Sequence, residues 1–165
     1  MKLAIRLVSL MALGCLGLWF WTDLFPSPEK VVLKKIYSLA ANANISANDS
    51  NIARAAKASN IISAFANDAE IVFDVSGLPE RTLSGREDIR EATMAGLANT
   101  PSLSVQFADA AAHVSPDKLS AEATCTARVS TGDNKDFGIQ ELRFQFKKID
   151  GDWRITRVET VKTLQ

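Results

Sequence analysis

The stretch FQFKKIDGDWRI, residues 144–155, says more about the fold of this chain than any other segment. On either side of its centre, apolar residues recur with the period of a half-buried strand. The central Asp150-Gly151 is a dipeptide that two-residue β-hairpin turns favour. The stretch therefore predicts an antiparallel hairpin, with strands over residues 137–149 and 153–161.

A two-residue turn also predicts the register of this hairpin. It gives three cross-strand pairs: Phe146 with Ile155, Phe144 with Arg157, and Leu142 with Glu159. Arg157 and Glu159 then share the apolar face with Phe144, Leu142 and Trp153. Charges on such a face lie either at the mouth of a pocket or in a compensated ion pair. We therefore interpret these five residues as candidates for lining a ligand pocket, and a structural salt bridge remains the alternative for the two charged ones.

Outward from the hairpin, towards the N-terminus, further elements can be assigned. Apolar spacing predicts a helix over residues 29–43, and Ser50 is a suitable cap for a second helix. Residues 70–75 read as a strand. Ser84 and Glu87 form a capping box, in which the serine side chain accepts an orphan N–H and the glutamate reaches back. The chain beyond Pro101 reads as strands only, and Cys125 in one of them is interpreted as a small buried hydrophobe.

This order of elements resembles the nuclear transport factor 2-like superfamily, which includes SnoaL-like cyclases and ketosteroid isomerase. The resemblance covers residues 29–165. The strand-to-helix step LSGREDI, residues 83–89, and the hairpin at 144–155 carry it. It implies an α+β fold in which a strongly curved antiparallel sheet wraps around N-terminal helices, forming a cone with a pocket at its open end. We expect this domain to occupy residues 30–165.

The N-terminal residues 1–25 predict one transmembrane anchor, followed by a Pro-rich spacer at 26–29. Lys2 and Arg6 lie at the N-terminal side of an uncharged apolar run, which favours a cytoplasmic start. The run ends in Trp19-Phe20-Trp21, which favours the far membrane interface. No small-residue cleavage site follows the run, so a retained anchor is favoured over a cleaved signal peptide or a lipoprotein. We therefore expect a single-pass inner-membrane protein with its C-terminal domain in the periplasm or outside the cell.

Composition excludes several classes of protein. Lys and Arg number 19, as do Asp and Glu, and this balance argues against a nucleic-acid binder. One His and two Cys cannot supply the four ligands of a Cys/His structural zinc site. We therefore expect neither a metal nor a cofactor.

Three residues are candidates for catalysis. Isomerase chemistry of the ketosteroid type needs a carboxylate base and hydrogen-bond donors for the oxyanion, which Asp74 and Tyr37 could supply. SnoaL-like and dehydratase relatives use a His–Asp pair, for which the chain offers His113 and Asp109. With a strand period of two, His113 shares a face with Phe107.

The sequence does not bring these groups into one set, so we favour a function without catalysis. The expected function is a membrane-tethered module that binds a protein partner or a small apolar ligand. A homodimer through the sheet is a further expectation. The alternative is a SnoaL-type isomerase or hydratase with a carboxylate base in the cone pocket.

Overall fold

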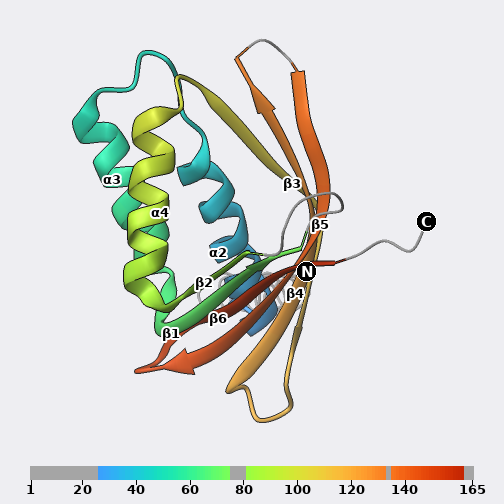
Figure 1. Cartoon of the computed structure of the whole chain (residues 1–165). Coiled ribbons are helices and arrows are strands. Elements are labelled where there is room, and N and C mark those ends of the chain that lie inside the picture. The colour runs from blue at the N-terminus through green and yellow to red at the C-terminus, as the bar shows by residue number, and fades with distance from the viewer. Residues whose placement is uncertain (1–25, 75–80, 133–134, 162–165) are drawn as a thin grey trace, which may run out of the picture.

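The computed structural model describes residues 26–74, 81–132 and 135–161, in which helices cover one face of a curved sheet (Figure 1). The helices are α2 (Pro28–Ala43), α3 (Asn51–Ser63) and α4 (Gly85–Asn99). The strands are β1 (Phe65–Phe73), β2 (Arg81–Ser84), β3 (Leu103–Val114), β4 (Ser120–Thr131), β5 (Lys135–Ile149) and β6 (Asp152–Val161). The anchor predicted at residues 1–25 lies outside the described residues. Among the helices that are described, none has the length and apolar character needed to span a membrane.

The six strands pair in the order β2-β1-β6-β5-β4-β3. β1 and β6 run parallel, and the other neighbours run antiparallel. The C-terminal strand therefore lies inside the sheet, between β1 and β5, rather than at its edge. This arrangement confirms the predicted α+β architecture, with the sheet curving around the helices.

Side-chain caps explain where the first two helices begin. The Ser27 hydroxyl accepts a hydrogen bond from the Lys30 N–H at 3.4 Å, and Pro28 occupies the first turn, where its fixed φ suits a helix. Pro28 was assigned to the spacer from sequence, but the structure places it in α2. The Ser50 hydroxyl accepts from the Ala53 N–H at 3.2 Å, which confirms the predicted cap of α3.

The capping box predicted for α4 is wrong in its details. The Ser84 side chain makes no capping hydrogen bond, and Glu87 is exposed and pairs with Arg90. Instead, the Ser84 N–H donates to the Asp88 carboxylate at 3.3 Å. Ser84 has the extended backbone of an ordinary N-cap residue. Gly85 follows it with a φ of +86°, which is not helical, so the first residue after the cap departs from the geometry of a capping box.

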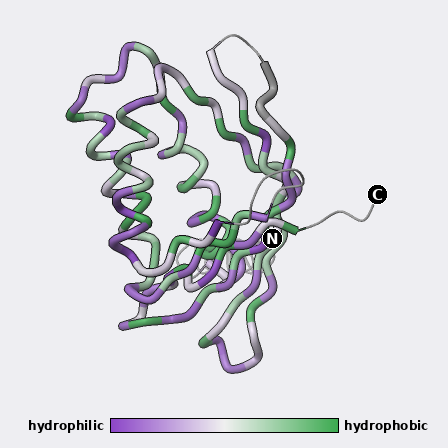
Figure 2. Tube along the Cα trace, in the orientation of Figure 1, coloured by the Kyte–Doolittle hydropathy of each residue, from purple (hydrophilic) through white to green (hydrophobic). Residues whose placement is uncertain are grey.

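The hydrophobic core lies between the helices and the inner face of the sheet, which is the face that the helices cover. Hydrophobic and hydrophilic residues alternate along much of the chain (Figure 2), and the buried ones meet here. Val32 and Ile36 of α2 are completely buried, as is Ile155 of β6. Cys125 is 2% exposed, which confirms that it is a small buried residue.

The final hairpin has the predicted turn, and its register is as predicted for the residue pairs near the turn but not beyond them. Asp150 and Gly151 have φ values of 52° and 86°, as a type I′ turn requires. Phe146 pairs with Ile155 as expected. Beyond this point Thr156 is an extra residue in β6, so a β-bulge shifts every later pair by one position.

A second bulge interrupts β3. Ala108 pairs with Thr126 but Ala111 pairs with Thr124, so Asp109 and Ala110 lie opposite Cys125 alone. Asp109 has a φ of 52°, in the left-handed region. As in β6, residues on the two sides of the bulge change faces relative to a regular strand.

Candidate functional site

The inner face of the sheet is unevenly covered, and its strands carry residues of very different size. All inward residues of β4 from Ala121 to Ala127 are small, being alanine or cysteine, and all are buried. Their neighbours on β5 are large, and exposure rises along the strand from Phe146 (1%) and Phe144 (3%) to the half-buried Leu142. The core is therefore filled around Phe146 and less covered around Leu142.

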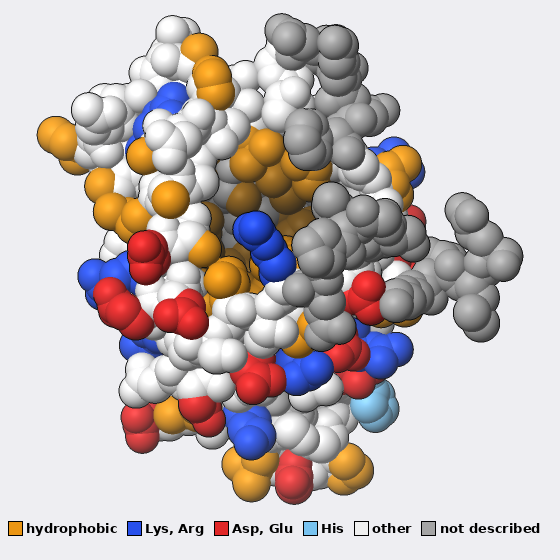
Figure 3. Space-filling view, viewed as in Figure 1, with side chains coloured by type: hydrophobic (Ala, Val, Ile, Leu, Met, Phe, Trp, Pro, Cys, Tyr) orange, Lys and Arg blue, Asp and Glu red, His pale blue; other side chains and the backbone are white. Residues whose placement is uncertain are grey.

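Other strands supply apolar side chains to the same region. Ile71 of β1 lies between Val158 of β6 and Leu83 of β2 in the sheet. The ring of Phe107 on β3 packs against that of Phe144, with centroids 6.0 Å apart and planes tilted by 58°. Together with Leu142, the half-buried Ile71, Leu83 and Phe107 form what we call the cone lining. In Figure 3 hydrophobic side chains gather in a hollow between the helices and the sheet.

Both neutral and charged residues lie near the cone lining, and a Lys or Arg side chain borders the hollow in Figure 3. Thr160, opposite Leu142, exchanges two hydrogen bonds with the backbone of Asp74, both at 2.9 Å. The Gln140 side chain donates to the Val161 carbonyl at 3.0 Å. Burial raises the pKa of the Cys125 thiol to about 11, so it is protonated at neutral pH and a poor nucleophile. Nowhere in the described part of the chain do three or more His, Cys, Asp or Glu side chains gather as metal ligands. The apolar side chains of the cone lining suit a largely apolar molecule.

The three predicted catalytic residues lie on three different parts of the fold. Tyr37 is 48% exposed, whereas the buried positions of α2 are Val32, Ile36, Leu39 and Ala40. His113 is exposed and pairs with Glu122 across β3 and β4. Asp74 directly follows β1, and its backbone bonds the hydroxyl of Thr160 in β6. In β1 itself, Ile71 faces inward and Val72 lies opposite Glu159. The structure therefore does not bring the three together.

The predicted shared face of His113 and Phe107 is wrong. Phe107 packs on the core, but the bulge at Asp109 turns His113 to the outer face of the sheet, away from the helices. Without the bulge, six residues along a strand would return a side chain to the same face.

The bulge at Thr156 in β6 corrects the predicted positions of Arg157 and Glu159. Phe144 pairs with Val158 rather than Arg157, and Leu142 pairs with Thr160 rather than Glu159. Arg157 instead pairs with the exposed Gln145 on the outer face. Phe144, Leu142 and Trp153 remain on the inner face, as their burial shows.

On the outer face Arg157 and Glu159 belong to a chain of ion pairs, which we call the outer charge row. Arg157 contacts Glu70 at 2.7 Å and Glu159 at 3.0 Å. Arg143 contacts Glu159 at 3.3 Å and Glu122 at 3.7 Å. The row links β1, β6, β5 and β4. The alternative predicted for Arg157 and Glu159, a structural salt bridge, therefore describes the contacts that they make.

Sequence reasoning missed most of the cone lining. Ile71, Leu83 and Phe107 come from strands that are distant in sequence from Leu142. Their alternation could identify them as inward residues, but only the sheet order shows that they meet. Asn44 was also missed: its side chain bonds both N–H and C=O of Val105, which fixes the end of α2 to β3.

Comparisons with known proteins agree with this geometry. A family model described as a SnoaL-like domain matches residues 52–159. No curated protein shows a significant match.

Solved structures with the same fold are numerous. A nuclear transport factor 2-like protein of unknown function from Pseudomonas putida has a TM-score of 0.65 at 14% identity, covering 86% of this chain and 90% of that chain. A nuclear transport factor 2-like protein from Novosphingobium aromaticivorans has a TM-score of 0.60 at 17% identity, covering 79% of each chain. A proposed dehydratase of the same family from Streptomyces avermitilis has a TM-score of 0.60 at 16% identity, covering 82% of this chain and 96% of that chain. At these identities the likeness shows the fold alone.

Proposed function

The chain belongs to the SnoaL-like domain family, and we propose that its cone binds a small apolar or aromatic molecule without transforming it chemically. The observation that carries the proposal is the cone lining, which consists of the half-buried apolar side chains of Ile71, Leu83, Phe107 and Leu142. Apolar contact supplies the affinity.

The enzymatic alternative is a SnoaL-type isomerase or hydratase, and a dehydratase has been proposed for one structural neighbour. Such chemistry requires a base whose proton acceptor reaches the substrate in the pocket. Within residues 26–74, 81–132 and 135–161, the candidates Tyr37, Asp74 and His113 are dispersed rather than convergent. Binding without catalysis is therefore the function that we favour.

A site-resolved titration tests the proposal. The full chain, with isotope-labelled methyl groups and held in neutral lipid nanodiscs, is titrated with 2-naphthol as a neutral aromatic probe. We expect the methyl resonances of Leu142 and Ile71 to shift in a saturable way. Leu119 is 59% exposed in the turn before β4, and its methyl resonances should not move.

A matched pair of variants completes this experiment. Leu142→Gln places an amide in the cone lining and should weaken binding by about tenfold, since one buried aliphatic side chain contributes about 1.5–3 kcal/mol. Leu119→Gln makes the same change on the exterior and should leave affinity unchanged. Equal binding by both variants, or equal shifts of Leu119 and Leu142, would refute the cone as the binding site.

The proposal includes a membrane tether at residues 3–21 that holds the domain on the non-cytoplasmic side. The apolar run, the charges at Lys2 and Arg6 and the terminal Trp-Phe-Trp support it. A retained tether keeps the full chain in the membrane pellet after alkaline extraction, and protease added to spheroplasts then degrades the domain. Release into the supernatant, or protection from the protease, would contradict this arrangement.

A further inference from the structure

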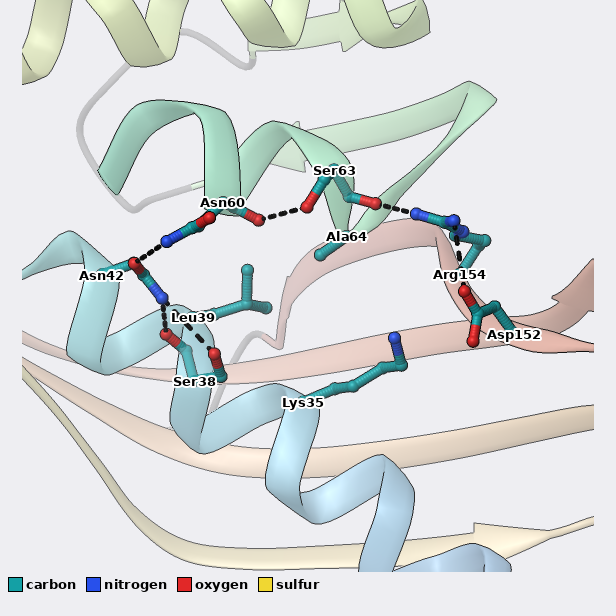
Figure 4. A pocket seen from close by; sticks show the side chains of 9 residues that line it. All are labelled: Lys35, Ser38, Leu39, Asn42, Asn60, Ser63, Ala64, Asp152 and Arg154. Atoms are coloured by element: carbon teal, nitrogen blue, oxygen red, sulfur yellow. Dashed lines mark hydrogen bonds and ion pairs between the residues drawn. The ribbon is translucent and has the colours of Figure 1, made fainter. Parts of the chain in front are cut away.

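A second cavity lies outside the cone, between α2, α3 and the start of β6 (Figure 4). Its volume is about 550 Å³, within the range of small-molecule sites. It shares no residue with the cone lining. Its lining consists of Lys35, Ser38, Leu39, Asn42, Asn60, Ser63, Ala64, Asp152 and Arg154.

One wall of this cavity is a set of polar side chains that hold one another in place. The Asn42 amide donates to the Ser38 carbonyl at 2.7 Å, and the Asn60 amide donates to the Asn42 side-chain oxygen at 2.9 Å. The Ser63 hydroxyl donates to the Asn60 carbonyl at 2.8 Å. The bond between Asn60 and Asn42 joins α3 to α2, and the other two lie within one helix each, so the wall has a defined shape before any ligand arrives.

The two cations of the cavity differ in what they contact. Arg154 donates to the Ser63 carbonyl and pairs with Asp152 at 3.4 Å. The Lys35 ammonium points into the cavity (Figure 4), and no carboxylate of the described residues pairs with it. With Asp152 opposing one of two cations, the lining keeps one positive charge.

Lys35 is not needed to stabilise the nearby end of α3. Carbonyl oxygens at a helix C-terminus attract cations, but those of α3 already have donors. The Asn60 and Ser63 carbonyls accept from Ser63 Oγ and Arg154, and those of Ile61 and Ile62 accept from the Ala64 N–H. The Ala64 carbonyl accepts from the Ile155 N–H at 2.9 Å. The ammonium of Lys35 therefore has its donors available for a ligand.

From this geometry we propose that the cavity binds a small monoanionic carboxylate with a short apolar body. The carboxylate contacts the Lys35 ammonium, and one negative charge matches the one positive charge of the lining. Leu39 and Ala64 provide apolar surface beside the ammonium for the body of the ligand. This site is independent of the proposed cone ligand, so each can fail without the other.

Calorimetric titration of the full chain in neutral nanodiscs tests the site, with benzoate as the probe, benzamide as its uncharged match and empty nanodiscs as the blank. Benzoate should bind saturably and benzamide should not. Raising the salt concentration from about 50 to about 500 mM should weaken binding, because the contact is electrostatic. Equal binding of benzamide, or tighter binding of inorganic phosphate or of anionic lipid in the disc, would overturn the proposal.

Variants of two adjacent lysines locate the site. Lys35→Met should weaken benzoate binding by about tenfold or more, since a charge-assisted hydrogen bond contributes about 1.5–3 kcal/mol. Lys35→Arg should retain most of the affinity. Lys34 is exposed and does not line the cavity, so Lys34→Met should bind as the native chain does. An unchanged thermal midpoint in all three variants verifies folding, and equal affinities of Lys35→Met and Lys34→Met would refute the site.

Discussion

Trp153 shows how much of the core depends on a single side chain. It is 4% exposed at the start of β6 and belongs to the same buried cluster as Phe144 and Phe146. The ammonium of Lys148 lies 5.9 Å from the centre of the indole, in a cation–π contact near the hairpin turn. The sequence analysis places Trp153 on the apolar face of the hairpin, and its burial beside Phe144 and Phe146 confirms that face.

Replacing Trp153 with alanine should lower the free energy of unfolding by about 3–5 kcal/mol, through lost apolar contact and the cavity left behind. Urea denaturation followed by circular dichroism measures the loss. Leu119→Ala, at a site that is 59% exposed, is the control and should change stability by less than about 0.5 kcal/mol. A loss below about 1 kcal/mol for Trp153→Ala would contradict the burial of the indole.

Among the elements, those fixed by local chemistry could be predicted from sequence. The Asp150-Gly151 turn needs two residues with positive φ, and the Ser50 cap needs only a hydroxyl before the first turn. Both signals lie within a few residues of the structure that they specify. The helices and strands flanking them were predicted for the same reason.

The two bulges are where prediction of the site failed. A period of two assumes that every residue advances a strand by one position, but Thr156 and Asp109 each add a residue without a cross-strand partner. These bulges depend on the neighbouring strands, because two paired strands of a curved sheet must bend together. No local sequence signal indicates where they bend. Arg157 and His113 were consequently assigned to the wrong face, whereas Phe144 lies on the face predicted for it.

Strain at the β3 bulge gives a prediction for this element. Asp109 adopts a φ of 52°, which β-branched residues tolerate poorly. Asp109→Val should therefore lower the free energy of unfolding by about 1–2 kcal/mol, although the site is exposed, while Asp109→Gly should be neutral or slightly stabilising. Chemical denaturation of the two variants measures the difference.

Gln106→Val is the control for this comparison, because Gln106 is exposed on a regular part of the same strand. Valine suits such a position, so stability should change by no more than about 0.5 kcal/mol. If Asp109→Val were as stable as Asp109→Gly, backbone strain would not be the property that defines this bulge.

At the scale of the whole molecule, the outer charge row ties together strands from both halves of the chain. Glu70 and Arg157 are 87 positions apart in sequence, yet their side chains meet at 2.7 Å. The side chains around Arg157 are 26–47% exposed, so water screens these pairs. Their contribution is therefore modest, and it depends on the whole sheet being formed.

Arg157→Met should lower the free energy of unfolding by about 1 kcal/mol, because Glu70 and Glu159 lose a shared cation. The double variant Arg157→Met with Glu159→Gln should lose less than the two single changes together, which a double-mutant cycle measures. Arg128 is exposed on the same face and has no ion pair among the described residues. Arg128→Met should therefore have almost no effect, and a similar loss from both arginine variants would argue against a specific row.

The place of β6 inside the sheet also determines when the sheet can be completed during synthesis on the ribosome. With 87 positions between Glu70 and Arg157, and synthesis at about 5–20 residues per second, β1 leaves the ribosome roughly 4–17 s before the strand that completes it. Throughout that interval one edge of β1 is unpaired, a state in which nascent chains associate with one another. Asp68 and Glu70 place two negative charges in the middle of this strand, so neighbouring nascent chains repel each other there until β6 arrives.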